Sequence, residues 1–171
     1  MVDTVKNLPQ IIAKIMEKNE DDIRIIIAEF FTYLEENEMI INGTHWESCY
    51  NVHYKGKLVC NLCMNEECVN FLIEIVGDYS TEYKNIPIDE NIKKIAWENV
   101  RCCSDWGCSD VNRCGFGKRK TIFDKEFDNV CRYVIRFDEM NLKIFECIKQ
   151  LLKMRKTDIL TDITLNQYLD F

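Results

Sequence analysis

The sequence of 171 residues is poor in proline, glycine and histidine, and it holds no long apolar run. Two prolines and six glycines leave no room for a disordered linker, so we expect one domain over residues 1–171. No apolar run approaches the roughly eighteen residues of a membrane span. The N-terminus lacks the basic and apolar stretches of a secretory signal. We therefore expect a cytoplasmic protein, without a membrane partner, whose thiols are reduced.

Basic residues are outnumbered by acidic ones, 22 against 29, which gives a formal net charge of −7. General nucleic-acid binding needs a positive field that exchanges for phosphate counterions, so we do not expect it. The two histidines, His45 and His53, have no serine or cysteine and acidic neighbours in a pattern typical of a catalytic triad. The sequence therefore favours a protein that is not an enzyme, and an enzyme stays an alternative. Partners stay unknown, and self-association into a homo-oligomer is left open.

Apolar residues at three- and four-residue steps predict amphipathic helices over 3–18 and 21–37. Pro9 interrupts the first pattern, so its regular part is expected to begin there, with Asn7 or Leu8 as the cap. Asp21 and Asp22 are well placed at the start of the second helix, where the helix dipole favours carboxylates. Residues 1–40 are thus predicted to form a helical N-terminal segment.

From Cys49 onward the apolar period changes to two, which predicts three antiparallel strands over about 49–54, 58–65 and 68–75. A three-residue loop, Lys55–Lys57, would keep the apolar residues of the first two strands on one face. The register that follows pairs Tyr54 with Leu58, Val52 with Cys60, Tyr50 with Leu62 and Cys49 with Cys63.

The second half is predicted to contain a helix over 89–100, a strand over 129–137 and a helix over 141–156. Residues 101–120 show no period, and the last fifteen residues are ambiguous. The order predicts an α+β fold with N-terminal helices, an antiparallel meander with a further strand, and a C-terminal helix. Residues 49–156 would carry the sheet, a cysteine-rich loop and that helix.

Two short motifs resemble those of uncharacterised small bacterial α+β proteins. These motifs are the hairpin Tyr54–Lys57 and the stretch Lys125–Cys131, which reads Lys-Glu-Phe-Asp-Asn-Val-Cys. In those proteins the two motifs flank a cysteine-rich loop. The resemblance covers roughly residues 46 to 156. The family carries no established activity, so the resemblance implies the fold and adds nothing on function.

Five of the ten cysteines fall within thirty residues: Cys102, Cys103, Cys108, Cys114 and Cys131. A segment without apolar periodicity needs another means of order, and four thiolates can hold a zinc ion tetrahedrally. Glycines would let the backbone turn closely around the ion, and Lys118, Arg119 and Lys120 would lower the electrostatic cost of the thiolates. We expect structural zinc there, with an iron–sulfur cluster or unligated thiols as alternatives.

Three functions are compatible with the sequence. The first is a zinc-binding module with a binding or regulatory role. The second is a thiol redox enzyme or sensor, using either the neighbours Cys102 and Cys103 or the cross-strand pair Cys49 and Cys63. The third is a small-ligand-binding domain with its pocket between the meander and the helices.

Cys60 and Cys63 form a C-x2-C motif, but in one strand they would point to opposite faces. Cys147 is expected in the core.

Overall fold

The computed structural model describes residues 8–18, 21–44, 49–65, 70–76, 88–103 and 117–169. The chain divides into two compact units, one made of Met1–Ile73 with Asp138–Phe171 and the other of Glu74–Phe137. The α+β prediction is confirmed, because each unit combines helix with antiparallel strands. The prediction of a single domain stays a prediction.

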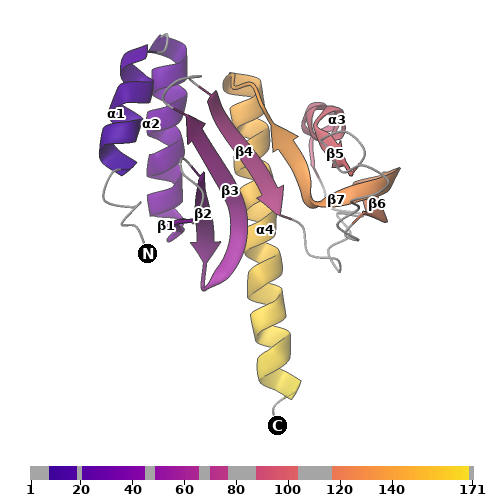
Figure 1. Cartoon of the computed structure of the whole chain (residues 1–171). Helices are drawn as coiled ribbons and strands as arrows, with labels where there is room; N and C mark the ends of the chain where they lie inside the picture. The colour runs from indigo at the N-terminus through magenta and orange to yellow at the C-terminus, as the bar shows by residue number, and fades with distance from the viewer. Residues whose placement is uncertain are drawn as a thin grey trace. The chain divides into compact units, whose positions relative to one another are not determined.

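The first unit contains three helices and the sheet that follows the first two of them. In chain order its elements are α1 (Leu8–Lys18), α2 (Asp21–Glu36), β1 (Ile40–Gly43), β2 (Cys49–Tyr54), β3 (Lys57–Asn65), β4 (Asn70–Val76, which continues into the second unit) and α4 (Leu142–Leu169). The strands follow one another in the order β1-β2-β3-β4. α1 and α4 contact β3, and α2 contacts both helices. In Figure 1, α4 passes behind the strands, and α1 and α2 stand beside them at the left.

The second unit is built on one long strand, β7 (Lys125–Phe137), with β5 (Val100–Cys102) and β6 (Lys118–Ile122) antiparallel to it. Cys102 of β5 and Lys118 of β6 both pair with Val130. The two short strands therefore occupy opposite edges of β7. The helix α3 (Glu90–Glu98) precedes β5 and contacts β7.

Two polar contacts join α3 to the turn between β6 and β7. Lys93 Nζ lies 2.7 Å from Asp124 and 2.8 Å from Glu90, and the hydrogen bond to Asp124 raises the pKa of the lysine. Trp97 Nε1 donates to the carbonyl of Ile122 at 2.8 Å. Asp89 caps the helix, because its Oδ1 accepts a hydrogen bond from the main-chain amide of Asn91 at 2.8 Å.

The helix predictions are confirmed within one or two residues at most ends, whereas three short strands were missed. β1 and β5 contain four and three residues, too few for a period of two to be visible. Residues 118–120, at the end of the segment that shows no period, belong to β6. α4 runs to Leu169, so the last residues that looked ambiguous are mostly helical.

The β2–β3 turn differs from the prediction by one residue. Val52 pairs with Cys60 and Cys49 with Cys63 as predicted, but Tyr54 pairs with Lys57 and not with Leu58. Lys55 and Gly56 both have positive φ, 47° and 75°, which is the conformation of a two-residue type I′ turn. An irregularity beside Val52 then restores the predicted pairing further from the turn.

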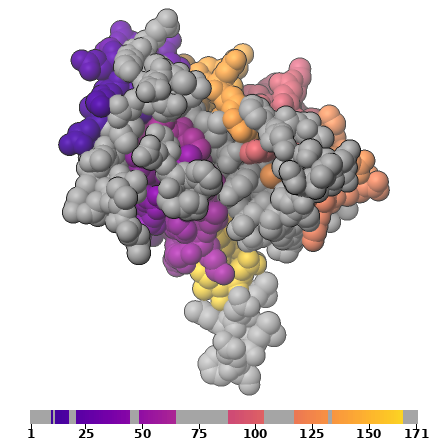
Figure 2. Space-filling view, in the orientation of Figure 1, coloured from indigo at the N-terminus to yellow at the C-terminus, as the bar shows by residue number. Residues whose placement is uncertain are grey.

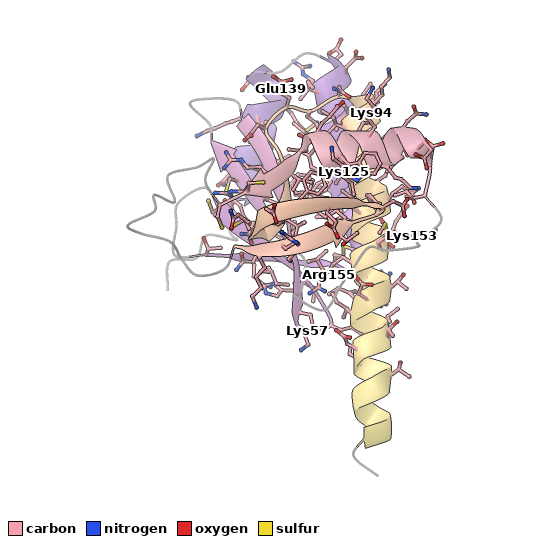
Figure 3. The ribbon with its side chains drawn as sticks, turned by 90° about the vertical axis from the view of Figure 1, so that its right-hand side faces the viewer. Lys57, Lys94, Lys125, Glu139, Lys153 and Arg155 are labelled. Carbon is pink, nitrogen blue, oxygen red and sulfur yellow. The ribbon has the colours of Figure 1, made fainter. Side chains whose placement is uncertain are left out.

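The core of the first unit lies between the sheet and the helices. Tyr50, Val52 and Leu62 are almost completely buried, and the rings of Phe30 and Phe145 meet edge-on with centroids 6.4 Å apart. Arg155 of α4 is buried too, with 2% of its surface exposed. Its guanidinium donates to the carbonyl of Leu58 at 3.3 and 3.4 Å (Figure 3). This contact joins α4 to β3.

Candidate functional site

Two thiols lie side by side in the described structure, those of Cys49 on β2 and Cys63 on β3. Their Sγ atoms lie 2.8 Å apart, and both residues are half-buried. Among the seven cysteines that the structure describes, none forms a disulfide, so the pair is a dithiol. The prediction that these two cysteines face each other is confirmed.

The backbone defines which kind of cross-strand pair this is. The amide and the hydroxyl of Thr44 donate to the carbonyl of Cys49, at 3.3 and 3.0 Å. In an antiparallel sheet the N–H and C=O of one residue point to the same neighbour, so those of Cys49 point toward the strand of Thr44. Cys49 and Cys63 therefore form a non-hydrogen-bonded pair, the type whose side chains lie closer together.

The dithiol belongs to the outer face of the sheet, because Cys49 and Cys63 are half-buried whereas the neighbouring Tyr50 and Leu62, which project from the other face, are buried. Next to it runs a row of three amides, because Asn42 pairs with Asn51 and Asn51 pairs with Asn61. His53 lies beyond this row, and its Nδ1 is 3.0 Å from Nδ2 of Asn42. Figure 2 shows that atoms of the early strands, coloured purple to magenta, reach the surface that faces the viewer.

Asn61 carries an unused acceptor in this row. Its Oδ1 atom is buried and has no hydrogen-bond partner among the residues that the structure describes. A buried polar atom without a partner is costly, and native structures contain few of them. Asn61 lies two residues from Cys63 on the same strand, so both side chains project from the same face.

Two other cysteines are unsuited to redox chemistry because they are buried. Cys60 and Cys147 are completely enclosed. Burial raises the pKa of both thiols, to about 12 for Cys147. The core assignment of Cys147 is confirmed, as is the divergence of Cys60 and Cys63 to opposite faces. The C-x2-C motif is therefore not a site.

The predicted zinc ligands are only partly within the described structure. Cys108 and Cys114 lie outside the described residues. Cys102 ends β5, Cys103 follows it, and Cys131 is buried in β7. Within the described ranges, no three histidine, cysteine or acidic side chains form a group that could hold a metal ion. The zinc site therefore stays a prediction.

The two ends of the segment 104–116 meet at β7. The amide of Cys103 donates to the carbonyl of Asn129 at 2.8 Å. A β-carbon added to Gly117 would lie 3.1 Å from Sγ of Cys103 and 3.5 Å from the oxygen of Asn129. Position 117 therefore favours glycine, because its backbone lies so close to Cys103 that a side chain would crowd the Sγ atom. Nearby, Arg119 forms an ion pair with Asp128 at 2.7 Å.

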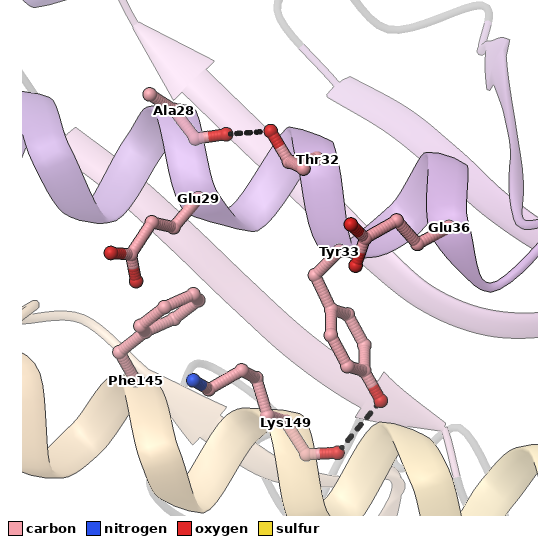
Figure 4. Close-up of a pocket in the computed structure, with 7 residues that line it drawn as sticks. All are labelled: Ala28, Glu29, Thr32, Tyr33, Glu36, Phe145 and Lys149. Atoms are coloured by element: carbon pink, nitrogen blue, oxygen red, sulfur yellow. Dashed lines mark hydrogen bonds between the residues drawn. The ribbon is translucent and has the colours of Figure 1, made fainter.

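A hollow of about 320 Å³ lies between α2 and α4, not between the sheet and the helices where a ligand pocket was expected. Figure 4 shows its lining: Ala28, Glu29, Thr32, Tyr33, Glu36, Phe145 and Lys149. The ammonium of Lys149 lies 4.6 Å from the ring centroid of Phe145, so a cation of the chain itself already covers the aromatic surface. The hollow contains no thiol and no histidine.

Comparison with known proteins adds no further assignment. No protein family, no curated protein and no solved structure matches this chain. In the part of the chain that the structure describes, no helix is long and apolar enough to cross a membrane. The dithiol of Cys49 and Cys63 is therefore the site on which a functional argument can be built.

Proposed function

We propose that this protein is a cytoplasmic thiol redox protein whose dithiol, Cys49 and Cys63, is oxidised reversibly to a disulfide. The distance of 2.8 Å between the two Sγ atoms carries the proposal. Two sulfurs at this distance need only a small side-chain movement to form a covalent bond, which is about 2.05 Å long. No change of strand register is required.

The oxidant would be a hydroperoxide, and the chemistry needs only the two thiols. The thiolate of one cysteine attacks a peroxide oxygen, the O–O bond breaks, and a sulfenic acid forms as the first water or alcohol leaves. The second sulfur then attacks the sulfenic sulfur. The S–O bond breaks and a second water leaves, so two thiols have lost two electrons and two protons. Low-molecular-weight thiols reverse the reaction by two exchange steps.

The strand geometry favours a disulfide that is easily reduced. In a non-hydrogen-bonded pair the Cα atoms are about 4.5 Å apart, near the short limit of the range that disulfides tolerate. Such a bond is strained, and strained disulfides have more oxidising potentials than structural ones. A cytoplasmic thiol pool would therefore return the pair to its reduced form, which suits a sensor better than a permanent cross-link.

Peptide mapping by mass spectrometry tests the proposal. Native reduced protein is treated with hydrogen peroxide, alkylated and digested without reductant. We expect a cross-linked peptide containing Cys49 and Cys63, which dithiothreitol resolves. In Cys49→Ser or Cys63→Ser this peptide is absent, whereas in Cys103→Ser, the matched control, it forms as in the wild type. Full alkylation of both cysteines after peroxide treatment would contradict the proposal.

A second candidate function is the zinc module predicted from the loop cysteines. The observation that favours it is the contact of Gly117 with Cys103, since the two described residues that flank the stretch with Cys108 and Cys114 lie side by side, one of them with a thiol. Elemental analysis of protein purified under reducing conditions tests it. The loop cysteines should contribute about one equivalent of zinc, and unchanged metal content in Cys114→Ser would contradict their role.

A further inference from the structure

We propose that the reduced dithiol also binds one thiophilic divalent cation, Zn²⁺ or Cd²⁺, with Oδ1 of Asn61 as an oxygen ligand. The inference rests on the same pair of cysteines as the proposed redox function. It adds a ligand class and a third residue to that site, and it couples metal binding to the oxidation state of the pair.

The two sulfurs supply the soft part of the ligand set. Tetrahedral zinc with Zn–S bonds of about 2.3 Å holds two thiolates roughly 3.8 Å apart. The observed separation of 2.8 Å must therefore widen by about 1 Å. Directly opposed β-carbons in an antiparallel pair lie about 4.5 to 5.5 Å apart, so rotation of the two side chains provides this room. The strands need not move.

Asn61 supplies the observation that points to a ligand. Its buried Oδ1 lacks a hydrogen-bond partner among the described residues, although amide oxygens normally find one when buried. Residues two apart on a strand are separated by about 6.6 Å and project from the same face. An amide and a thiol reaching toward each other span this gap, so an ion held by Cys63 is within reach of Asn61.

The remaining coordination position is left for water, because Cys49 and Cys63 are half-buried and not enclosed. Cation binding requires both sulfurs as thiolates, whereas the disulfide offers neither. Binding of the ion therefore protects the pair from peroxide, and oxidation releases the ion. By linkage, each equilibrium shifts the other to the same extent.

Titration of the reduced full-length protein with Cd²⁺ tests the inference, with the ultraviolet charge-transfer band of sulfur–cadmium bonds as the readout. Competition with a chromophoric chelator gives the affinity for Zn²⁺. Relative to the wild type, we expect Cys49→Ser and Cys63→Ser each to lose one equivalent of bound ion. Any ion held by the loop cysteines stays in these variants, so the two sites are counted separately.

The role of Asn61 is tested by a matched set of variants. Asn61→Leu should lower the affinity of this site for the ion by about tenfold or more, while peroxide still forms the disulfide. Asn61→Asp keeps the oxygen and adds charge, so it should bind at least as tightly as the wild type and covers the case in which the leucine variant fails to fold. Asn42→Leu, at the exposed end of the amide row, should leave binding unchanged.

The outcomes separate this inference from the proposed redox function. Wild-type protein that forms the Cys49–Cys63 disulfide but binds no more ion than Cys49→Ser would overturn the metal site and leave the redox function standing. Ion binding that depends on both cysteines, without peroxide-driven disulfide formation, would overturn the redox function alone. Equal affinity in Asn61→Leu, Asn61→Asp and the wild type would remove Asn61 from the ligand set.

Discussion

The hydroxyl of Tyr33 on α2 donates to the main-chain carbonyl of Lys149 on α4 at 3.1 Å (Figure 4). The two residues are 116 positions apart in the sequence, so this bond is one of the contacts that join the N-terminal helices to the C-terminal one. Burial raises the pKa of Tyr33 above its ordinary value of 10.0, because the ionised phenol would lose its hydration.

Replacing Tyr33 by phenylalanine should lower the free energy of unfolding by about 0.5 to 1.5 kcal/mol, since one partly buried hydrogen bond is lost. In the wild type, the contribution of the neutral phenol is complete below pH 10.0 and falls as the pH rises further, because the unfolded tyrosine ionises first. In Tyr33→Phe the free energy of unfolding should not show this decrease above pH 10.0, because phenylalanine does not ionise. Urea unfolding at several pH values measures both effects.

The matched control is Thr32→Ala on the same helix. The hydroxyl of Thr32 bonds only to the carbonyl of Ala28 within α2 among the contacts described, at 3.0 Å, and its side chain is exposed. Thr32→Ala should therefore change the free energy of unfolding by less than about 0.5 kcal/mol. If Tyr33→Phe and Thr32→Ala lowered the free energy of unfolding equally, the hydrogen bond between α2 and α4 would contribute no more to stability than the bond within α2.

Oxidation of Cys49 and Cys63 should stabilise the folded protein. The cysteines are 14 positions apart, and closing a loop of about 15 residues stabilises by up to about 3 kcal/mol through the unfolded state. For a chain of this size that corresponds to a rise in Tm of about 6 to 12 °C, less any strain in the disulfide. Thermal unfolding of the peroxide-treated and reduced forms measures it.

The control is Cys49→Ser, which cannot form this disulfide. Its Tm should be the same after peroxide treatment as in the reduced form. A Tm that rises equally in this variant would assign the effect to other thiols. A Tm that falls on oxidation of the wild type would mean that strain exceeds the loop entropy, which contradicts the expected sign.

The type I′ turn of β2–β3 gives a prediction about two adjacent residues. Gly56 has a φ of 75°, and a β-carbon there would meet no atom within 4 Å. Gly56→Ala should therefore cost only backbone strain, about 1 to 2 kcal/mol. Lys55, with a φ of 47°, is a poor residue for this conformation, so Lys55→Asn should stabilise slightly. Chemical denaturation that ranks the two variants in the opposite order would refute the turn assignment.

Buried Arg155 should matter more than its charged neighbours on α4. Arg155→Ala leaves the carbonyl of Leu58 without the guanidinium, which costs about 1 to 3 kcal/mol, and it also removes the packing of the side chain. Lys153→Ala, exposed on the same helix, should change stability by less than about 0.5 kcal/mol. Urea midpoints compare the two, and equal values would argue against the contact between α4 and β3.

Much of the candidate site was predictable because a hairpin converts sequence spacing into geometry. Alternating apolar residues fix which face of β2 and β3 is buried, and the turn then places Cys49 opposite Cys63. The prediction failed by one residue at the turn itself, where positive φ at a lysine is not encoded by any apolar pattern. The unpartnered oxygen of Asn61 was missed, since hydrogen-bond satisfaction depends on all three strands.

The amino-acid sequence by itself determined most of the helices and longer strands, and the faces on which Cys49, Cys60 and Cys63 lie. These features follow from side-chain periods, which act over a few residues. Tertiary structure alone decided the short strands, the division into two units and the burial of Arg155. Each of these depends on contacts between residues far apart in the chain, such as Leu58 with Arg155, and no local pattern records which distant partner will be present.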